Sequence, residues 1–416
     1  MKLFVLGVLL VASAPCISGV TAITGAKVWT GTHAEPVTDA TILIDNGRIV
    51  SVKSRGAVPA DAMEIPASGR VVTPALVDAA TQIGLGEVGA IDEEHRGQVT
   101  SGPLGPSFSL AYGFDPEDQA VRQARADGVG WALVYPSGSG SAPFDGMAAI
   151  IELGSTDAHV DQPRAALVVT IAGAAASRAG GSTAAAWQLL RNAFDEARSY
   201  RQPVNAGTPR DQILNHLDAQ ALKPVLAGSI PIIVNCDRLS DIRQAIALAH
   251  DYKLKLIILG GAEAWAAADE LAQAHVPVIL DPFDTLPDTY DRLGVRPDGA
   301  ALLHKAGVEL AVSVSAQGIY RSWDAGPSMR EGAGLAVANG LPYDAALSAI
   351  TSSAAHILNL RPTVGTLGPG GSADLVIWDG DPLEPSSAPL QVIIHGEIIS
   401  PVTRQTLLRD RYAPRH

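Results

Sequence analysis

Residues 74–82 read Pro-Ala-Leu-Val-Asp-Ala-Ala-Thr-Gln, and they say most about the architecture of the chain. They continue an apolar run, Val71–Val77, that predicts a buried β-strand. From residue 71 to residue 360, further apolar runs alternate with amphipathic helical stretches. Such an alternation indicates parallel β/α units buried on both faces of the sheet. At this length, the leading architecture is a (β/α)8 barrel of the TIM type.

The middle region predicts both kinds of element. The expected strands are Val71–Val77, Trp131–Tyr135, Ile230–Val234, Leu256–Leu259, Val276–Leu280 and Val308–Val314. The expected helices between them are Leu239–His250, Ala262–Ala274 and Tyr343–Ile350. An open doubly wound sheet is the alternative, but no predicted strand is followed by a Gly-rich phosphate-binding turn.

Both ends of the chain are rich in short strands. In the segment 23–70, the Asn46-Gly47 pair predicts a tight hairpin, because Asn-Gly readily supplies the positive φ angles of a type I′ turn. The segment 361–416 contains two more predicted strands, Ala373–Trp378 and Leu390–His395. We expect the two ends to meet in one small β-sandwich beside the barrel of residues 71–360.

The first 22 residues resemble a secretory signal peptide. Lys2 precedes an apolar run, Leu3–Ala14, and small residues follow up to Ala22. The run is too short for a membrane span, which needs about 20 residues. We therefore expect cleavage after Ala22 and an exported, periplasmic protein with no membrane span in its mature form.

Composition excludes several classes of partner. The net charge is −13 and no Lys/Arg-rich run occurs, which argues against nucleic acid and anionic membranes. Once the signal is removed, Cys236 is the only cysteine, so no intramolecular disulfide can form. A large apolar core must therefore stabilise the fold.

Residues 74–82 closely resemble the first barrel strand of the amidohydrolase superfamily, Pro-Gly-apolar-apolar-Asp-x-His-x-His. The segment 364–381 resembles the closing segment of that family, Gly-x-Leu-x-Pro-Gly-x-x-Ala-Asp-Leu-Val. Residues 40–53 resemble a strand–turn–strand of the same family, and the middle segments 234–242, 260–265 and 332–359 are similar to its imidazolonepropionase-like branch. The resemblance implies a barrel whose mouth holds one or two divalent metals, commonly zinc, that activate water for hydrolysis of carbon–nitrogen bonds.

The metal ligands that this resemblance implies are replaced in this chain. The two histidine positions of strand 1 are Ala80 and Gln82, and the histidine of strand 5 corresponds to Asn235. Strand 6 ends in Gly260-Gly261, and the aspartate of strand 8 would fall near Ser315. Strand 4 is not placed, and Lys223, in a helix-like stretch, is a weak candidate. Because alanine has no donor atom and an amide oxygen is a poor ligand for a transition metal, we expect no bound metal and no cofactor.

Two functional hypotheses follow. The first is an exported amidohydrolase-like pseudoenzyme, a binding or partner homologue that pairs with a histidine-complete relative. The alternative is an active amidohydrolase that acts on amide, cyclic amide or peptide bonds through a remodelled site. Under either hypothesis, a small-molecule ligand would bind at the barrel mouth, and the catalytic residues are unknown.

Polar residues that follow the predicted strands are the candidates for this pocket, because barrel sites are built at the C-terminal ends of the strands. Asp237-Arg238 fits equally well as an ion pair or a helix cap, Glu263 as a charge that favours its own helix, and His95 as part of a solvated loop. Cys236 is expected to be a buried apolar side chain, and Asp78 to organise the turn after strand 1. The candidates are Gln82, Glu87, His95, Asn235, Asp237, Arg238, Glu263, Asp281, Ser315, Gln317 and Arg321.

Overall fold

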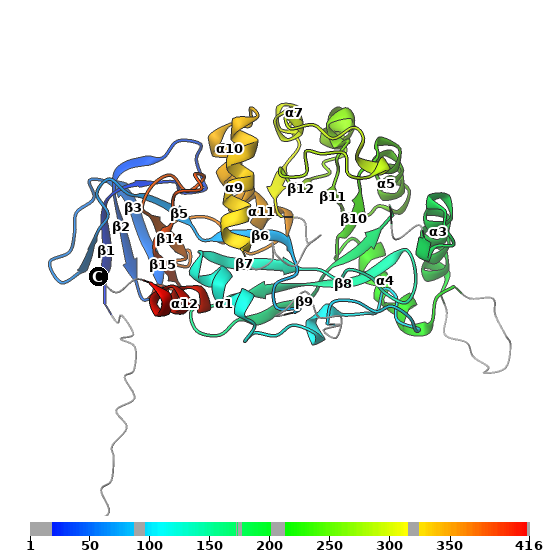
Figure 1. The fold of residues 1–416 in the computed structure, drawn as a ribbon, viewed down its shortest axis with the longest axis horizontal. Helices are drawn as coiled ribbons and strands as arrows, with labels where there is room; N and C mark the ends of the chain where they lie inside the picture. Colours follow the sequence, from blue (N-terminus) through cyan, green and yellow to red (C-terminus); the bar gives the residue numbers. More distant parts are fainter. Residues whose placement is uncertain are drawn as a thin grey trace, which may run out of the picture.

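The computed structural model describes residues 19–86, 96–171, 173, 177–200, 213–314 and 324–413. These residues form a mixed α/β fold with two large sheets (Figure 1). One sheet is built from the middle of the chain and the other from its two ends. No helix in these ranges is both long and apolar enough to cross a membrane.

The middle of the chain forms a nearly closed barrel sheet of eight strands in sequence order. All neighbouring strands pair in parallel except β8, which is antiparallel to both β7 and β9. The predicted barrel is thus confirmed as a nearly closed α/β barrel sheet, but its third strand, β8, is antiparallel to its neighbours. The strands are β6 (Leu76–Thr81), β7 (Val129–Val134), β8 (Phe144–Glu152), β9 (His159–Thr170), β10 (Ile232–Cys236), β11 (Leu256–Gly260), β12 (Val278–Leu280) and β13 (Leu310–Val312).

Helices connect and cover these strands (Figure 1). Two predicted helices are confirmed as α5 (Leu239–Tyr252) and α10 (Tyr343–Ala349), whereas the predicted helix 262–274 is divided into η2 (Ala264–Ala267) and α6 (Ala268–Gln273). The remaining helices are α1 (Gln119–Ala126), α3 (Thr183–Ser199), α4 (His216–Leu226), α7 (Gly299–Lys305), α9 (Ala325–Ala338), α11 (Ser352–Ile357), α12 (Arg404–Tyr412), η1 (Leu110–Tyr112) and η3 (Tyr290–Arg292).

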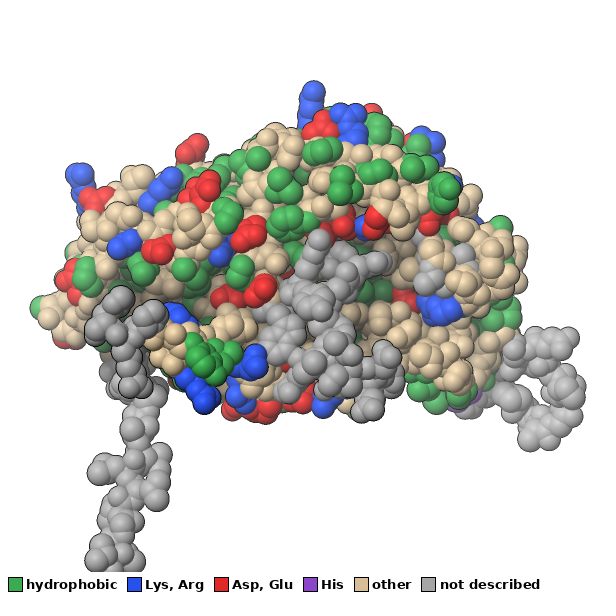
Figure 2. All heavy atoms as spheres, in the orientation of Figure 1, with side chains coloured by type: hydrophobic (Ala, Val, Ile, Leu, Met, Phe, Trp, Pro, Cys, Tyr) green, Lys and Arg blue, Asp and Glu red, His purple; other side chains and the backbone are tan. Residues whose placement is uncertain are grey.

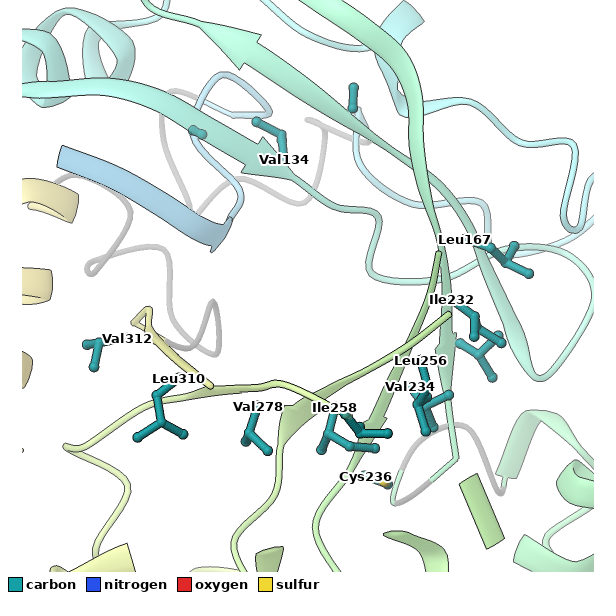
Figure 3. Close-up of a cluster of buried hydrophobic side chains, with 14 of the residues drawn as sticks. Val134, Leu167, Ile232, Val234, Cys236, Leu256, Ile258, Val278, Leu310 and Val312 are labelled. Carbon is teal, nitrogen blue, oxygen red and sulfur yellow. The ribbon is translucent and has the colours of Figure 1, made fainter. Parts of the chain in front are cut away.

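The two faces of the barrel strands bury different clusters. Val234, Cys236 and Ile258 belong to the larger cluster, which includes residues of the surrounding helices, and Figure 3 shows them on one side of the strands. Ile233 and Ile257 belong to a second cluster, which lies inside the barrel. Since side chains alternate along a strand, the residues two positions after these interior ones also point inward at the mouth.

The two ends of the chain share the second sheet. β5 (Val71–Pro74) pairs with β14 (Leu375–Trp378) and with β1 (Thr21–Val28), which joins the N-terminal and C-terminal strands. The meeting of the two ends is thus as predicted; a division into the two layers of a sandwich stays a prediction. The other strands are β2 (Val37–Asp45), β3 (Arg48–Ser54), β4 (Met63–Pro66), β15 (Pro389–Ile394) and β16 (Glu397–Ile398).

Local sequence explains two details of this sheet. Asn46 and Gly47 have φ angles of 48° and 73°, as the predicted type I′ hairpin requires. The single strand predicted at Val71–Val77 is wrong. It divides at Ala75 into β5, which joins the terminal sheet, and β6, which opens the barrel.

The first strand bears on the expected cleavage site. β1 begins at Thr21, and Ala22 is fully buried and pairs with Leu43. A mature chain that started at Ile23 would lose Thr21 and Ala22, which pair with Ile44 and Leu43.

Candidate site at the barrel mouth

The barrel mouth is formed by the C-terminal ends of the parallel strands. Because β8 is antiparallel, its first residues lie at the same end: Phe144 pairs with Val169, and Thr170 pairs with Asn235. Strand 4, which the sequence did not place, is β9. Lys223 lies in α4 and therefore not on that strand.

The first barrel strand, β6, and the last one, β13, are joined at the mouth through the buried Asp78. Asp78 accepts hydrogen bonds from the Ser313 hydroxyl at 2.8 Å and from the Ala80 N–H at 3.3 Å, and Ser313 also bonds to the Ala80 carbonyl oxygen. Burial raises the pKa of Asp78 to about 6, although these hydrogen bonds oppose the shift. Ala80 itself is buried among the interior apolar residues. The hydrogen bonds of Asp78 and Ser313 therefore connect the first and last strands at this end of the barrel.

We expect Ser313→Ala to destabilise the fold by about 1–3 kcal/mol at pH 8, the usual cost of removing a hydrogen bond to a charged group. Loss of the hydroxyl raises the pKa of Asp78 further, so the variant should lose less at pH 5, where the carboxyl is largely protonated. Urea unfolding at both pH values measures this. Ser54→Ala, at an exposed hydroxyl, is the control, and an equal loss at both pH values would contradict the role of Asp78.

A second buried aspartate lies across the mouth, at the start of β8. Asp145 accepts hydrogen bonds from the Thr170 hydroxyl at 2.5 Å and from the Arg178 guanidinium at 2.8 Å, and its side chain is only 2% exposed. Burial raises the pKa of Asp145 to about 6, against the effect of both partners. These residues could not be predicted from the sequence, because no local pattern shows that β8 begins at the mouth.

Asp237 is held by an arginine from the loop after strand 7. Arg292 donates to Asp237 at 3.0 Å and to Asp284 at 2.7 Å, and the Ala262 N–H donates to Asp237 at 3.1 Å. Asp237, Gly260, Asp281 and Arg292 line a cavity of about 50 Å³. This cavity has room for only a few water-sized groups.

Arg238 and Glu263 have structural partners. Arg238 is exposed and pairs with Asp291 at 2.7 Å, so it forms no ion pair with Asp237. Glu263 accepts from the Leu239 N–H at 2.8 Å, so it caps α5. Glu263 is also the residue that precedes η2, and the start of α5 lies beside the loop after β11, which explains this contact.

The structure gathers part of the predicted set. Asn235 and Asp237 both lie beside Gly260: their Oδ1 atoms are 3.4 and 2.8 Å from the position that a Cβ atom on Gly260 would occupy. Asp281 lines the same cavity as Asp237. Gln82 is half-buried after β6, and no described contact links it to the others. The remaining candidates lie outside the described residues: Glu87, His95, Ser315, Gln317 and Arg321.

In the described part of this mouth, the carboxylates of Asp78, Asp145 and Asp237 are already engaged by hydrogen bonds or ion pairs. The described strand ends present Ala80, Asn235, Gly260 and Ser313, and none of the described histidines follows a strand at the mouth. Burial, together with Asp241 and Asp237, raises the pKa of the Cys236 thiol well above its usual value, and this thiol is buried on the outer face. It is therefore an unreactive apolar group, as predicted.

Comparison with known proteins agrees with this architecture. A sequence profile of the amidohydrolase family matches residues 316–400. The crystal structure of an amidohydrolase from Thermotoga maritima superposes with a TM-score of 0.79 at 25% identity, covering 91% of this chain and 99% of that one. The chain belongs to the amidohydrolase superfamily. Its assignment to the imidazolonepropionase-like branch stays a prediction.

Two other similar proteins match this chain at lower sequence identity. Amidohydrolase tasK of Hapsidospora irregularis is 22% identical over 442 residues, which cover 90% of this chain but 43% of that protein. The chain thus spans less than half the length of this relative. A structure of molinate hydrolase, at 15% identity and a TM-score of 0.55 over 92% of this chain and 95% of that one, shares the fold.

Proposed function

We propose that this protein binds a small amide-containing molecule at the barrel mouth and lacks metal-dependent hydrolysis. The observation that carries the proposal is the donor set at the ends of strands 1, 5 and 6, where Ala80, Asn235 and Gly260 replace metal-ligating side chains. Without a metal, water keeps its ordinary pKa and is a weak nucleophile.

The charges at the mouth favour a neutral ligand. Asp145 is paired with Arg178, and Asp237 with Arg292. In the described part of the chain, no hydrogen bond engages the side-chain amides of Gln82 and Asn235. These amides can both donate and accept, which suits an amide or cyclic amide. A charged ligand would have to break an existing ion pair.

We also propose that the chain is exported by its first 22 residues and works beside a histidine-complete relative. The apolar run Leu3–Ala14 supports export. The second point is supported by the replacement of the expected ligand positions by Ala80, Gln82 and Asn235 while the fold motifs are retained.

The alternative, an active enzyme with a remodelled site, is favoured by Asp145. This carboxyl lies at the mouth and has a pKa raised to about 6, close to the value that suits a general base. Its two oxygens are already engaged by Thr170 and Arg178, which counts against this role.

Binding and turnover should be measured together on a panel of amides, lactams and dipeptides. We expect at least one neutral amide to raise the thermal unfolding temperature, Asn235→Ala to weaken that effect at least tenfold in ligand concentration, and no product to form with or without zinc. Exposed His250→Ala is the control for binding. Hydrolysis that is lost on chelation and in Asn235→Ala would overturn the proposal, and hydrolysis lost only in Asp145→Asn would support the alternative.

A further inference from the structure

A second cluster of ligating side chains lies at the foot of the barrel, the end opposite the mouth. Glu152 is the last residue of β8 and pairs with His159, the first residue of β9. Asp161 follows two positions later at a bulge in the same strand, and one of its carboxylate oxygens lies close to ligand atoms of Glu152 and His159. The hairpin that joins these antiparallel strands therefore brings together two carboxylates and one imidazole.

We infer that Glu152, His159 and Asp161 form a binding site for one divalent transition-metal ion such as Zn²⁺. One ligand atom from each residue lies within 4.8 Å of the other two. Zinc bonds of about 2.0–2.1 Å in a tetrahedron place ligand atoms about 3.3 Å apart. Small rotations of the exposed His159 and Asp161 side chains close this difference, while Glu152 is buried and fixed.

A histidine from the terminal sheet orients the buried carboxylate. The His395 Nε2 atom lies 2.7 Å from Oε1 of Glu152, which leaves Oε2 facing Nε2 of His159 at 3.6 Å. The backbone N–H of His395 donates in turn to Asp374 at 2.7 Å. Metal-ligating carboxylates are commonly held by such outer hydrogen bonds, so one oxygen is positioned and the other is left for the ion.

The guanidinium of Arg361 would compete with a metal ion for the Glu152 carboxylate. The Arg361 guanidinium lies 3.6 Å from Oε2 of Glu152, but its side chain is 65% exposed and also lies over the Trp131 ring at 5.0 Å. The ion would displace Arg361 from the carboxylate and leave it against the ring. A metal would then tie the β8–β9 hairpin, which already contacts the terminal sheet through His395, more firmly in place.

The test is a zinc titration of chelator-treated protein by calorimetry, with ZnCl2 alone as the probe. We expect one equivalent to bind to the unmodified protein, at least tenfold weaker binding in His159→Ala and Asp161→Asn, and unchanged binding in His250→Ala, a control at an exposed histidine outside the cluster. Arg361→Gln should bind zinc more tightly, because it removes the competing charge. A purely structural role for the cluster would not produce that gain.

The outcomes separate this inference from the proposed function. Zinc binding that is lost in His159→Ala supports the foot site and leaves the metal-free mouth untouched. No binding at 100-fold excess zinc overturns the foot site alone. Binding that persists in His159→Ala but is lost in Asn235→Ala or Asp281→Asn overturns both.

Discussion

Replacement of Arg178 by methionine is expected to lower the free energy of unfolding by about 3–5 kcal/mol at pH 8. The reason is that Asp145 is almost completely buried and Arg178 is the cation that faces it. Removing the cation from a buried carboxylate leaves an uncompensated charge, which costs about that much. Methionine keeps the volume of the apolar stem, so the loss reports the charge rather than a cavity.

The pH dependence gives this expectation its sign. The pKa of Asp145 in the folded protein is about 6, above its ordinary value of 3.8, because burial outweighs the hydrogen bonds of Thr170 and Arg178. A carboxyl with a raised pKa makes the fold less stable as pH rises from about 4 to about 6. Without Arg178 that pKa rises further, so the loss continues above pH 6. At pH 5 the carboxyl is mostly protonated, and Arg178→Met should then cost far less.

Urea unfolding of Arg178→Met at pH 5 and pH 8 measures both effects. Arg164→Met is the matched control, because Arg164 is an exposed arginine on β9. The double variant with Asp145→Asn should recover most of the stability at pH 8 and lose the pH dependence. An equal loss at both pH values would show that Arg178 acts through packing and not through the charge of Asp145.

Local patterns predicted those parts of the fold that depend on neighbours in sequence. The Asn46-Gly47 hairpin and helix α5 are examples. Strands β8 and β9 were missed, since Gly146 interrupts one and Pro163 and several polar residues interrupt the other. What holds these two strands in the sheet is pairing with each other and with β7 and β10, which no short window of sequence shows.

The direction of β8 decides where two carboxylates lie. In a strictly parallel barrel, Glu152 at the end of this strand would reach the mouth and Asp145 at its start would lie at the foot. The antiparallel strand reverses both, so Asp145 belongs to the mouth and Glu152 to the foot. Residue type and spacing predicted Asn235 and Asp237 at the mouth because β10 is parallel and alternates regularly.

Partners distant in sequence were also beyond prediction. The sequence predicted Asp237 as a pocket carboxylate, but Arg292, which lies 55 residues later in the chain, forms an ion pair with it. The same loop supplies Asp284, so one guanidinium joins strand 5 to the loop after strand 7. The candidate pocket is therefore smaller and less charged than its residue types indicate.

Replacement of Arg292 by methionine is expected to cost about 3 kcal/mol, because it leaves two carboxylates near each other in a mostly buried place. The side chains of Arg292, Asp237 and Asp284 are only 14%, 14% and 24% exposed. Adding Asp237→Asn to Arg292→Met should restore part of the loss, with a coupling energy of about 1–3 kcal/mol in a double-mutant cycle. Arg296→Met, which removes an exposed pair with Asp298, should cost much less.

Unfolding by urea at pH 7 measures all four corners of this cycle. Additive losses, within about 0.5 kcal/mol, would mean that Arg292 and Asp237 do not act as a pair. A measured coupling would bear on the ligand as well. Asp237 would then be committed to Arg292, and the neutral amide of Asn235 beside it would be the group left to recognise a molecule at the mouth. In Arg292→Met, the uncovered Asp237 carboxylate should make the mouth bind cationic amides in preference to neutral ones.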